Sequence, residues 1–485
     1  MASADRIDAD LAVVGSGAAG LYVALTASAA GARVALITAS SFAQTASYWA
    51  QGGLAAALAL DDSAEAHLRD TELAGRGLVR RSAAEQLCEE APDAVRDLER
   101  LGVRFDADRR GRLALGLEGG HSVRRIVHAG GSATGRRVVR QLSALAAETR
   151  RLEVLEHARA VALLVADGRC AGVALEDGRR IQARAVVICA GGAAAMWSRT
   201  TNPPGSLGTG MLLAHAAGAE LADLEFMQFH PTAVTGVPGR EGFLMTEAIR
   251  GEGARLLDSN GERFVEELAP RDEVSRAIDE SLRASGDDRV WLDMRMVDPA
   301  LFPNIAEALA EHGLDVGRDL VPVAPAAHYM VGGITTDLDG RSTLPGLFAV
   351  GESACTGLHG ANRLASNSLS ECFVFGARAA LAAAAEPAAA GASEARPAAP
   401  ATLEVTPATK AALWRLGGLW RTREGLEELL GDANPLARLI AACALRREET
   451  RGVHARIDFP QLDPALDHRH TIVAPDGSVR REHWR

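Results

Sequence analysis

Short segments of this chain bring histidine, arginine and threonine side chains together with glycines and turn residues. They span residues 118–125, 228–232, 246–272, and 326–329 with 359–363. The guanidinium group of arginine is planar and can bind a carboxylate through two parallel hydrogen bonds. Several arginines that converged on one pocket would therefore suit a substrate with two carboxylates.

Some of these residues have simpler explanations. A single histidine such as His121 is more often a hydrogen-bonded structural residue than a catalyst, and Arg124 and Arg125 could both be solvated. His215 lies in an apolar, helix-like run, where we expect a structural role. Neither an H-E-x-x-H string nor a Cys/His cluster occurs, so we expect no metal site. No G-x-S-x-G string points to a hydrolase.

These segments must be positioned by a fold, and the stretch Asp10–Gly31 gives the clearest indication of which one. An apolar strand, a glycine turn and an Ala/Leu-rich helix follow one another there. The turn has the pattern G-x-G-x-x-G, formed by Gly15, Ser16, Gly17, Ala18, Ala19 and Gly20. Its glycines allow a tight turn, the close approach of a pyrophosphate and close packing of helix on strand, and the helix start can bind phosphate. With a second strand at Arg33–Ile37, this stretch predicts dinucleotide binding.

The second strand lacks a feature of nicotinamide-binding folds, which is an acidic residue near the strand end that binds the ribose. Here the strand ends at Leu36-Ile37-Thr38, and Thr38 can hydrogen-bond a ribose but carries no charge. This difference weakens the case for a nicotinamide cofactor and leaves a flavin dinucleotide open.

Composition indicates a globular protein of the cytoplasm. The net charge of −11 argues against binding to nucleic acid or to an anionic membrane surface. No apolar run reaches about 18 residues, so we expect no membrane span, and the polar N-terminus has no signal-peptide core. The 6 cysteines are scattered without a C-x-x-C pair, which fits reduced thiols in a cytoplasm better than disulfides.

We expect a discontinuous first domain, an insertion, a linker and a C-terminal helical domain. Their bounds are 1–223 with 332–381, then 224–331, 382–409 and 410–485, respectively. The first domain should contain a buried parallel sheet, because the strands near its glycine turn are apolar throughout. Hairpin signals at Asp167-Gly168 and Asp177-Gly178 add an antiparallel meander to it. The segment 382–409 is low in complexity and rich in Ala and Pro, as is typical of a linker.

The chemistry-bearing segments resemble the flavoprotein family of succinate dehydrogenase, fumarate reductase and L-aspartate oxidase. The matching strings are GSGAAG, YWAQGG, EGGHS-x-RRI, DLEFMQFHPTA, TEAIRGEGA, LAPRD, PAAHYMVGG, GLFAVGE and LHGANRLASNSL. The resemblance extends over nearly the whole chain and is weakest in the linker and tail. It implies an α/β fold with a Rossmann-like FAD-binding domain, an inserted α+β capping domain and a C-terminal helical domain.

The resemblance also implies a set of FAD-binding residues. Besides the glycine turn, they are Thr38, Ser47, Tyr48, Gln51, Gly52, Gly53, Val161, Gly191, Thr209, Glu352, Ser368 and Leu369. One position departs from the family, which usually has Gly-Asp-Gly where this chain has Gly208-Thr209-Gly210. Thr209 cannot supply the charge of that aspartate, so the departure bears on FAD affinity.

Within the family, Glu118 favours the branch that oxidises L-aspartate. Its carboxylate precedes Gly-Gly-His-Ser and could pair with the α-ammonium group of aspartate, which succinate lacks. Ala46 lies five residues before Gln51, where succinate dehydrogenases carry the histidine that binds flavin covalently, so the FAD should be non-covalent. The end of the chain also departs from the longer dehydrogenase tail. The alternative is a soluble fumarate reductase or succinate dehydrogenase flavoprotein subunit.

The resemblance assigns a role to each candidate catalytic residue. Two carboxylates would be held by Arg363, His328, His230 and Thr246, the ammonium group by Glu118, and a proton by Arg271. The expected product is iminoaspartate, with oxygen (giving hydrogen peroxide) or fumarate as acceptor. In the family this reaction opens the route to quinolinate and NAD, with quinolinate synthase as the next enzyme and a candidate partner. A flavin-dependent assembly subunit without turnover is the rival from another class, and the intact set of site residues speaks against it.

Overall fold

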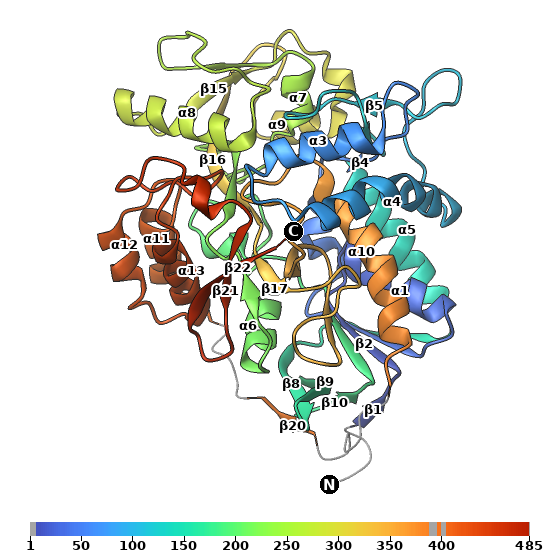
Figure 1. Ribbon diagram of the computed structural model, residues 1–485. Helices are drawn as coiled ribbons and strands as arrows, with labels where there is room; N and C mark the ends of the chain where they lie inside the picture. The colour runs from blue at the N-terminus through green and yellow to red at the C-terminus, as the bar shows by residue number, and fades with distance from the viewer. Residues whose placement is uncertain (1–5, 388–394, 399–403, 485) are drawn as a thin grey trace.

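The computed structural model describes residues 6–387, 395–398 and 404–484. The predicted nucleotide-binding region contains a parallel sheet in the order β18-β11-β2-β3-β7. Figure 1 labels β2 of this sheet in the lower part of the view. The strands are β2 (Leu11–Val14), β3 (Val34–Ile37), β7 (Leu152–Leu155), β11 (Ala185–Ile188) and β18 (Leu347–Ala349). The strands β2, β3, β11 and β18 are buried along their whole length, because helices and loops cover both faces of the sheet. The expected α/β fold is thereby confirmed.

Helices from distant parts of the chain pack over one face of this sheet. Those in contact with the sheet are α1 (Ala18–Ala29), α5 (Thr134–Glu148) and α10 (Asn367–Ala384), whereas α4 (Arg81–Arg100) packs on α10 and α3 (Ala64–Ala74) packs on α4. The helix α1 is apolar on nearly every side and packs against the sheet, α5 and α10, so most of its residues are buried. Gly376 of α10 lies against Tyr22 and Val23 of α1, where a larger side chain would push the two helices apart.

A second sheet forms the antiparallel meander. Its order is β1-β10-β9-β8-β20, with β1 (Arg6–Asp8), β8 (Ala160–Ala166), β9 (Arg169–Leu175), β10 (Arg180–Gln182) and β20 (Arg396–Pro397). The predicted hairpin signals lie at its turns, and both Asp167 and Gly168 have positive φ. Within the segment 382–409, residues 388–394 and 399–403 lie outside the described residues, whereas β20 between them pairs with β8.

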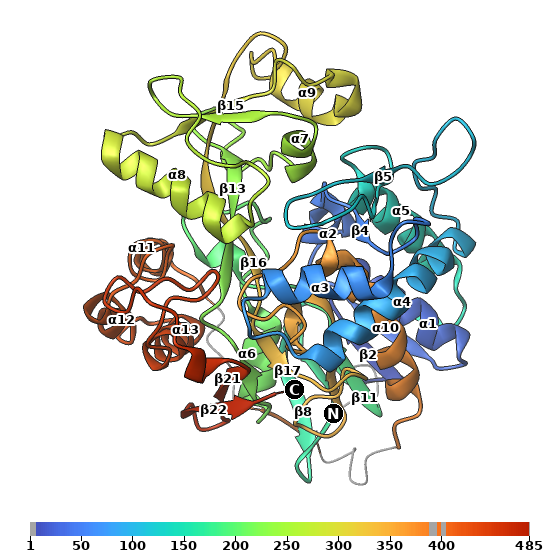
Figure 2. The ribbon, with the colours of Figure 1, turned by 45° about the horizontal axis from the view of Figure 1, so that its top comes forward.

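Residues 224–331 carry a sheet in the order β13-β16-β15-β14, at the top of Figures 1 and 2. Its elements are β13 (Met227–Val234), α7 (Glu247–Gly251), β14 (Arg255–Leu257), α8 (Arg271–Ser285), β15 (Val290–Asp293), α9 (Pro303–Ala310) and β16 (Val321–Met330). Most apolar side chains of residues 234–323 form a core cluster of their own. A core cluster of the parallel sheet instead includes Met227, Phe229, Ala327 and Met330. The long strands β13 and β16 are buried and carry residues of two candidate segments, Gln228–Thr232 and Ala326–Tyr329.

The C-terminal region is helical only in its first part. It has α11 (Pro407–Leu416), α12 (Arg423–Leu429) and α13 (Pro435–Arg446), followed by a hairpin of β21 (Arg469–Val473) and β22 (Val479–His483). The hairpin joins a third sheet, in the order β19-β17-β12-β21-β22, with β12 (Leu221–Ala222), β17 (Gly333–Thr335) and β19 (Ala354–Cys355). Buried ion pairs of Arg447 with Glu225 and Glu449 stabilise this contact.

Shorter elements complete the chain. They are α2 (Ala46–Trp49), β4 (Leu54–Ala55), β5 (Leu115–Gly116), β6 (Ile126–Val127) and α6 (Thr209–Ala216), with 3-10 turns at 42–44, 194–196, 299–301, 351–353 and 464–466. In the described part of the chain, no helix combines the length and the apolar composition that crossing a bilayer requires.

Candidate active site

The glycines of the turn between β2 and α1 allow the backbone to pack closely. Gly15 has a φ of +109°, and a Cβ built on it would lie 2.2 Å from the carbonyl oxygen of Cys189. A Cβ on Gly20 would lie 1.9 Å from the carbonyl oxygen of Gly15, so neither position tolerates a side chain without movement of the backbone. The turn leads directly into the N-terminus of α1, and dinucleotide folds bind a pyrophosphate at such a helix start.

Further predicted FAD-binding residues surround this turn. Ser47 accepts a hydrogen bond from the backbone N–H of Ala18 at 3.0 Å, which joins α2 to the glycine turn. Thr38 ends β3, where its hydroxyl accepts from Ser16 at 2.7 Å and donates to the carbonyl oxygen of Ser40 at 2.7 Å. The side-chain oxygen of Gln51 is buried without a hydrogen-bond partner among the described residues, so it is available to a cofactor.

The other predicted cofactor residues lie on several elements. Glu352 accepts from the backbone N–H of Met330 at 2.8 Å, and burial raises the pKa of its carboxyl to about 7. Gly191 follows β11 with positive φ, and Thr209 begins α6 after the left-handed Gly208. The remaining positions are Tyr48 in α2, Gly52 and Gly53 before β4, Val161 in β8, and Ser368 and Leu369 in the first turn of α10. The glycine turn at the start of α1 and the unpartnered side-chain oxygen of Gln51 fit a dinucleotide cofactor.

Four of the six predicted catalytic residues form two pairs. One pair, Arg271 and Arg363, is bridged by Gln228, and the other, His230 and His328, is in direct ring contact. The side-chain oxygen of Gln228 accepts from Nη1 of Arg271 at 3.2 Å and from Nε of Arg363 at 3.3 Å. The rings of His230 and His328, on β13 and β16, lie edge to face with their centroids 5.0 Å apart. The site therefore has two buried guanidinium groups bridged by one amide.

Arg363 lacks an ion-pair partner among the described residues. Its guanidinium lies 4.5 Å over the ring of Tyr329, and Nη1 donates to the hydroxyl of Ser368 at 2.8 Å. Burial, together with the nearby charge of Arg271, lowers the pKa of Arg363 to about 10, so it stays charged at neutral pH. A buried cation without an ion-pair partner is suited to pair with a carboxylate that enters the site.

The two histidines are neutral hydrogen-bonding groups. Burial, followed by the charge of Arg271, holds the pKa of His230 and of His328 well below the ordinary value. Nδ1 of His230 accepts from the backbone N–H of Thr232 at 3.3 Å, which leaves the proton on Nε2. Nδ1 of His328 is hydrogen-bonded to the hydroxyl of Thr201 at 2.7 Å.

Thr246 lies near the histidine strand. It immediately precedes α7 and is buried, and the N–H of its neighbour Met245 bonds to the carbonyl oxygen of Thr232 at 3.0 Å. The assignment of the Thr246 hydroxyl to the substrate site stays a prediction.

Glu118 is buried on the loop after β5. Its Oε2 accepts from the hydroxyl of Ser366 at 2.6 Å, whereas Oε1 has no hydrogen-bond partner among the described residues. Gly119, the next residue, donates its backbone N–H to Glu247 at 3.1 Å. Glu247 also accepts from Arg271, so the loop of Glu118 is tied to the candidate proton residue.

The structure shows which of His121, Arg124 and Arg125 are buried within the protein and which is solvated. Arg125 is fully buried and pairs with Asp62 and Asp70, so it is not solvated, whereas Arg124 is exposed. His121 is hydrogen-bonded to the carbonyl oxygen of Ala365 at 2.9 Å, as expected for a structural histidine. Arg125 therefore stabilises the loop that carries Glu118.

Residues with no assigned role in the sequence prediction also belong to the cluster. They are Gln228, Glu247, Arg250 and Ser366, all of which are buried. Each lies inside a string that carried the family resemblance, and that was the only signal of them in the sequence. No His, Cys, Asp and Glu cluster suited to a metal ion occurs within the described ranges.

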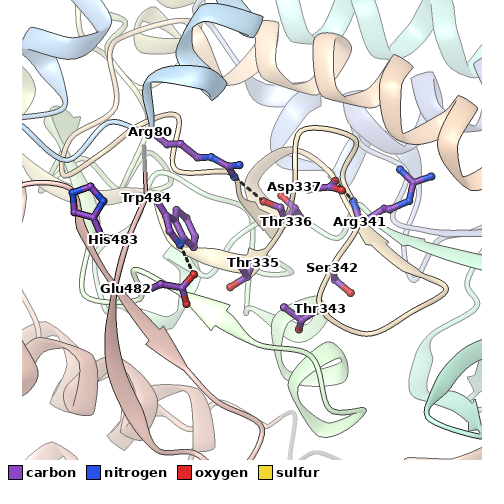
Figure 3. Close-up of a pocket in the computed structure, with 10 residues that line it drawn as sticks. All are labelled: Arg80, Thr335, Thr336, Asp337, Arg341, Ser342, Thr343, Glu482, His483 and Trp484. Carbon is purple, nitrogen blue, oxygen red and sulfur yellow. Dashed lines mark hydrogen bonds between the residues drawn. The ribbon is translucent and has the colours of Figure 1, made fainter.

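A separate pocket of about 530 Å³ lies between the end of β22 and the loop after β17 (Figure 3). Arg80 and Trp484 border it, with Glu482 on the strand beside them. None of the predicted site residues lines this pocket, so the candidate active site is the buried cluster around Arg271 and Arg363.

Comparisons with known proteins identify the family of the chain. A family model described as "FAD binding domain" matches residues 10–369, and one described as "Fumarate reductase flavoprotein C-term" matches residues 419–483. The chain is thus a flavoprotein of the succinate dehydrogenase and fumarate reductase class, and FAD is its cofactor. A mutant of the quinol fumarate reductase FrdA of E. coli superimposes with a TM-score of 0.88 at 29% identity, covering 99% of this chain and 97% of that chain. Sdh1 of Mycobacterium smegmatis in complex with UQ1 gives 0.82 at 30% identity, covering 99% and 95%.

Curated relatives identify the branch of this class to which the chain belongs. The L-aspartate oxidase of Streptomyces coelicolor is 42% identical over 96% of this chain and 91% of its own length. That of Caulobacter vibrioides is 43% identical over 93% of this chain and 94% of its own length. The chain belongs to the L-aspartate oxidase family, which confirms the resemblance on which the sequence prediction rested.

Proposed function

We propose that this protein oxidises L-aspartate to iminoaspartate, with oxygen (giving hydrogen peroxide) or fumarate as the acceptor. The product would feed the formation of quinolinate, and through it pyridine nucleotide biosynthesis, which makes quinolinate synthase the proposed partner and the cytoplasm the proposed location. FAD, when bound, supplies the acceptor for the hydride that leaves the substrate. The contacts of the chain's own residues support the steps described below.

Binding of the two carboxylates is assigned to the buried cations and imidazoles. Arg363 has a free charge to offer, and a bidentate contact with a carboxylate would orient as well as attract the substrate. The neutral His230 and His328, with Thr246, would bind the other carboxylate through hydrogen bonds. Because both imidazoles are neutral, they would orient the carboxylate through hydrogen bonds and would add no positive charge to the site.

The observation that carries the choice of substrate is the free oxygen of Glu118. Oε1 is buried and has no hydrogen-bond partner among the described residues, an arrangement that is costly unless a ligand donates to it. The ammonium group of L-aspartate is such a donor, because it carries three N–H bonds and a positive charge. Succinate and fumarate have no group that could satisfy this oxygen.

Movement of a proton is assigned to the row Arg271, Glu247 and Arg250. Nε of Arg271 donates to Oε2 of Glu247 at 2.7 Å, and Oε1 of Glu247 lies 3.4 Å from Nη2 of Arg250. Burial lowers the pKa of Arg250, which brings this guanidinium closer to giving up a proton than one in water. The row would hold the proton that the substrate loses when the hydride leaves.

Non-covalent binding of FAD is supported by the residue at the attachment position. Ala46 begins α2, and its methyl side chain has no atom that could form a bond with the cofactor. The glycine turn and the other predicted FAD-binding residues would then hold FAD by non-covalent contacts alone.

The test of this function uses purified protein loaded with FAD. Hydrogen peroxide should form with L-aspartate and should not form with D-aspartate or succinate. The variant Glu118→Gln keeps the size of the side chain and removes its charge, so it should lower kcat/KM for L-aspartate much more than kcat/KM for fumarate reduction. Equal losses in the two reactions would overturn the role of Glu118 and favour the alternative discussed next.

The second candidate function is fumarate reduction by the same site. It is favoured by the superposition on the fumarate reductase FrdA and by the fact that Arg363 and the two histidines can bind a dicarboxylate without an ammonium group. Faster turnover of fumarate with a chemical reductant than of L-aspartate with oxygen would support it.

A further inference from the structure

Ser366 has a backbone conformation that a serine rarely adopts. It immediately precedes α10 with a φ of +60° and a ψ of −1°, in the left-handed region, and it is buried. Residues other than glycine in this region are strained, and such strain concentrates at functional sites, where the surrounding structure maintains it. The hydrogen bonds of the Ser366 side chain indicate which contact this backbone conformation serves.

The hydroxyl of Ser366 accepts one hydrogen bond and donates another. It accepts from the backbone N–H of Gly53 at 3.2 Å, and the carbonyl oxygen of Ser366 accepts from the N–H of Ala55 at 3.2 Å. A hydroxyl has one proton to donate, and here that proton goes to Oε2 of Glu118 at 2.6 Å. The donation occupies one oxygen of Glu118 and leaves Oε1 as the unpartnered one.

The space beside this pair is kept open by Gly52. A Cβ built on Gly52 would lie 3.3 Å from Oγ of Ser366 and 3.5 Å from Oε1 of Glu118. A longer side chain would therefore contact both polar groups. The backbone of residues 52–53 thus borders the carboxylate, and the serine hydroxyl sets its rotation.

We propose that Ser366 is a positioning residue for substrate specificity, which orients the carboxylate of Glu118 so that Oε1 faces the ammonium group of the substrate. The inference deepens the proposed function and rests on it, because it acts through Glu118. A hydrogen bond from a neutral hydroxyl to a carboxylate is short and strong, and it costs the carboxylate none of its charge. Ser366 therefore affects amino dicarboxylates and leaves plain dicarboxylates unaffected.

The test compares Ser366→Ala, Ser366→Gly, Glu118→Gln and the double variant Glu118→Gln with Ser366→Ala. Both Ser366 variants remove the hydroxyl, but glycine also removes the backbone strain, so an effect shared by the two belongs to the hydroxyl. The expected loss in kcat/KM for L-aspartate is about tenfold or more, the usual size for a hydrogen bond to a charged group. The kcat/KM for fumarate and the inhibition constant of succinate should change less than about twofold, well below that hydrogen-bond effect. In the Glu118→Gln background, Ser366→Ala should add almost nothing.

Ser368→Ala is the matched control. This serine lies two residues further along and accepts from Arg363, so its loss should weaken both substrates and succinate together. The dissociation constant of FAD, measured by fluorescence quenching, should be unchanged in the Ser366 variants.

The outcomes below support or overturn the proposed role of Ser366. Selective loss in Ser366→Ala and Ser366→Gly that disappears in the double variant supports the proposal. If Glu118→Gln is selective but the Ser366 variants weaken both reactions equally, add fully to Glu118→Gln, or lose FAD, then Ser366 has a structural role and only this inference fails. If Glu118→Gln itself is not selective, the proposed role of Glu118 fails as well.

Discussion

Nε of Arg271 donates a hydrogen bond to Oε2 of Glu247 at 2.7 Å, and both side chains are buried where α7 and α8 begin. Oε1 of the same carboxylate accepts from the backbone of Gly119. Glu247 therefore joins the candidate proton residue to the loop of Glu118. Burial raises the pKa of Glu247, but the charges of Arg271 and Arg250 outweigh it and leave the pKa below its ordinary value.

The variant Glu247→Gln should lose stability and activity together. Breaking a buried ion pair costs about 3–5 kcal/mol, because the remaining guanidinium groups lose their partner. Since the pKa of Glu247 is lowered in the folded state, its stabilising contribution is present above the unfolded value of 4.5 and is lost as the pH falls through the folded value. Urea unfolding at several pH values should show a gap between wild type and variant at pH 7 that narrows below about pH 4.5. A gap that is independent of pH would contradict this role for the carboxylate.

The variant Arg363→Leu should prevent binding of every dicarboxylate. Arg363 offers the substrate a buried charge that no carboxylate of the described chain occupies, and loss of such a contact typically costs about 2–5 kcal/mol. We therefore expect succinate inhibition, L-aspartate oxidation and fumarate reduction to weaken in parallel. Normal succinate inhibition in a variant that still binds FAD would remove Arg363 from the substrate site.

The variant Gly20→Ala should abolish FAD binding. Its Cβ would lie 1.9 Å from the carbonyl oxygen of Gly15, so α1 or the glycine turn must move. Gly205→Ala is the control, because a Cβ there has no heavy atom within 4 Å apart from those of its chain neighbours, and its φ is not in the left-handed region. FAD titration by fluorescence should show binding in the control only. Unchanged affinity in Gly20→Ala would mean that the turn does not hold the cofactor.

The flavin should separate from the chain when the protein is denatured. Acid or heat should release free FAD into the supernatant, because Ala46 has no atom for a covalent bond. The absorbance spectra of the supernatant and of the washed precipitate give the measurement. Yellow colour that remains in the precipitate would show a covalent link and place it at another residue.

Much of the parallel sheet and of the cofactor turn could be predicted from the sequence. The strand Leu11–Val14, the turn Gly15–Gly20 and the helix that follows are encoded locally, because apolar runs and positive-φ glycines constrain only their own neighbourhood. The hairpins of the meander follow from the Asp-Gly pairs in the same way. The C-terminal hairpin could not be predicted, because the polar strand β22 gains its place by pairing with β21 at the sheet edge.

The sequence by itself therefore determined the family, the cofactor turn and the types of residue available for catalysis. Only the tertiary structure decided which of them meet, because a hydrogen bond depends on atoms whose positions are set by the packing of distant segments. Ser366 and Glu118 are 248 residues apart in the chain, yet their side-chain oxygens lie 2.6 Å apart. Arg271 and Arg363 likewise both donate a hydrogen bond to the side-chain oxygen of Gln228. Gln228 carries no charge, and its sequence context alone did not predict that it bridges the two arginines.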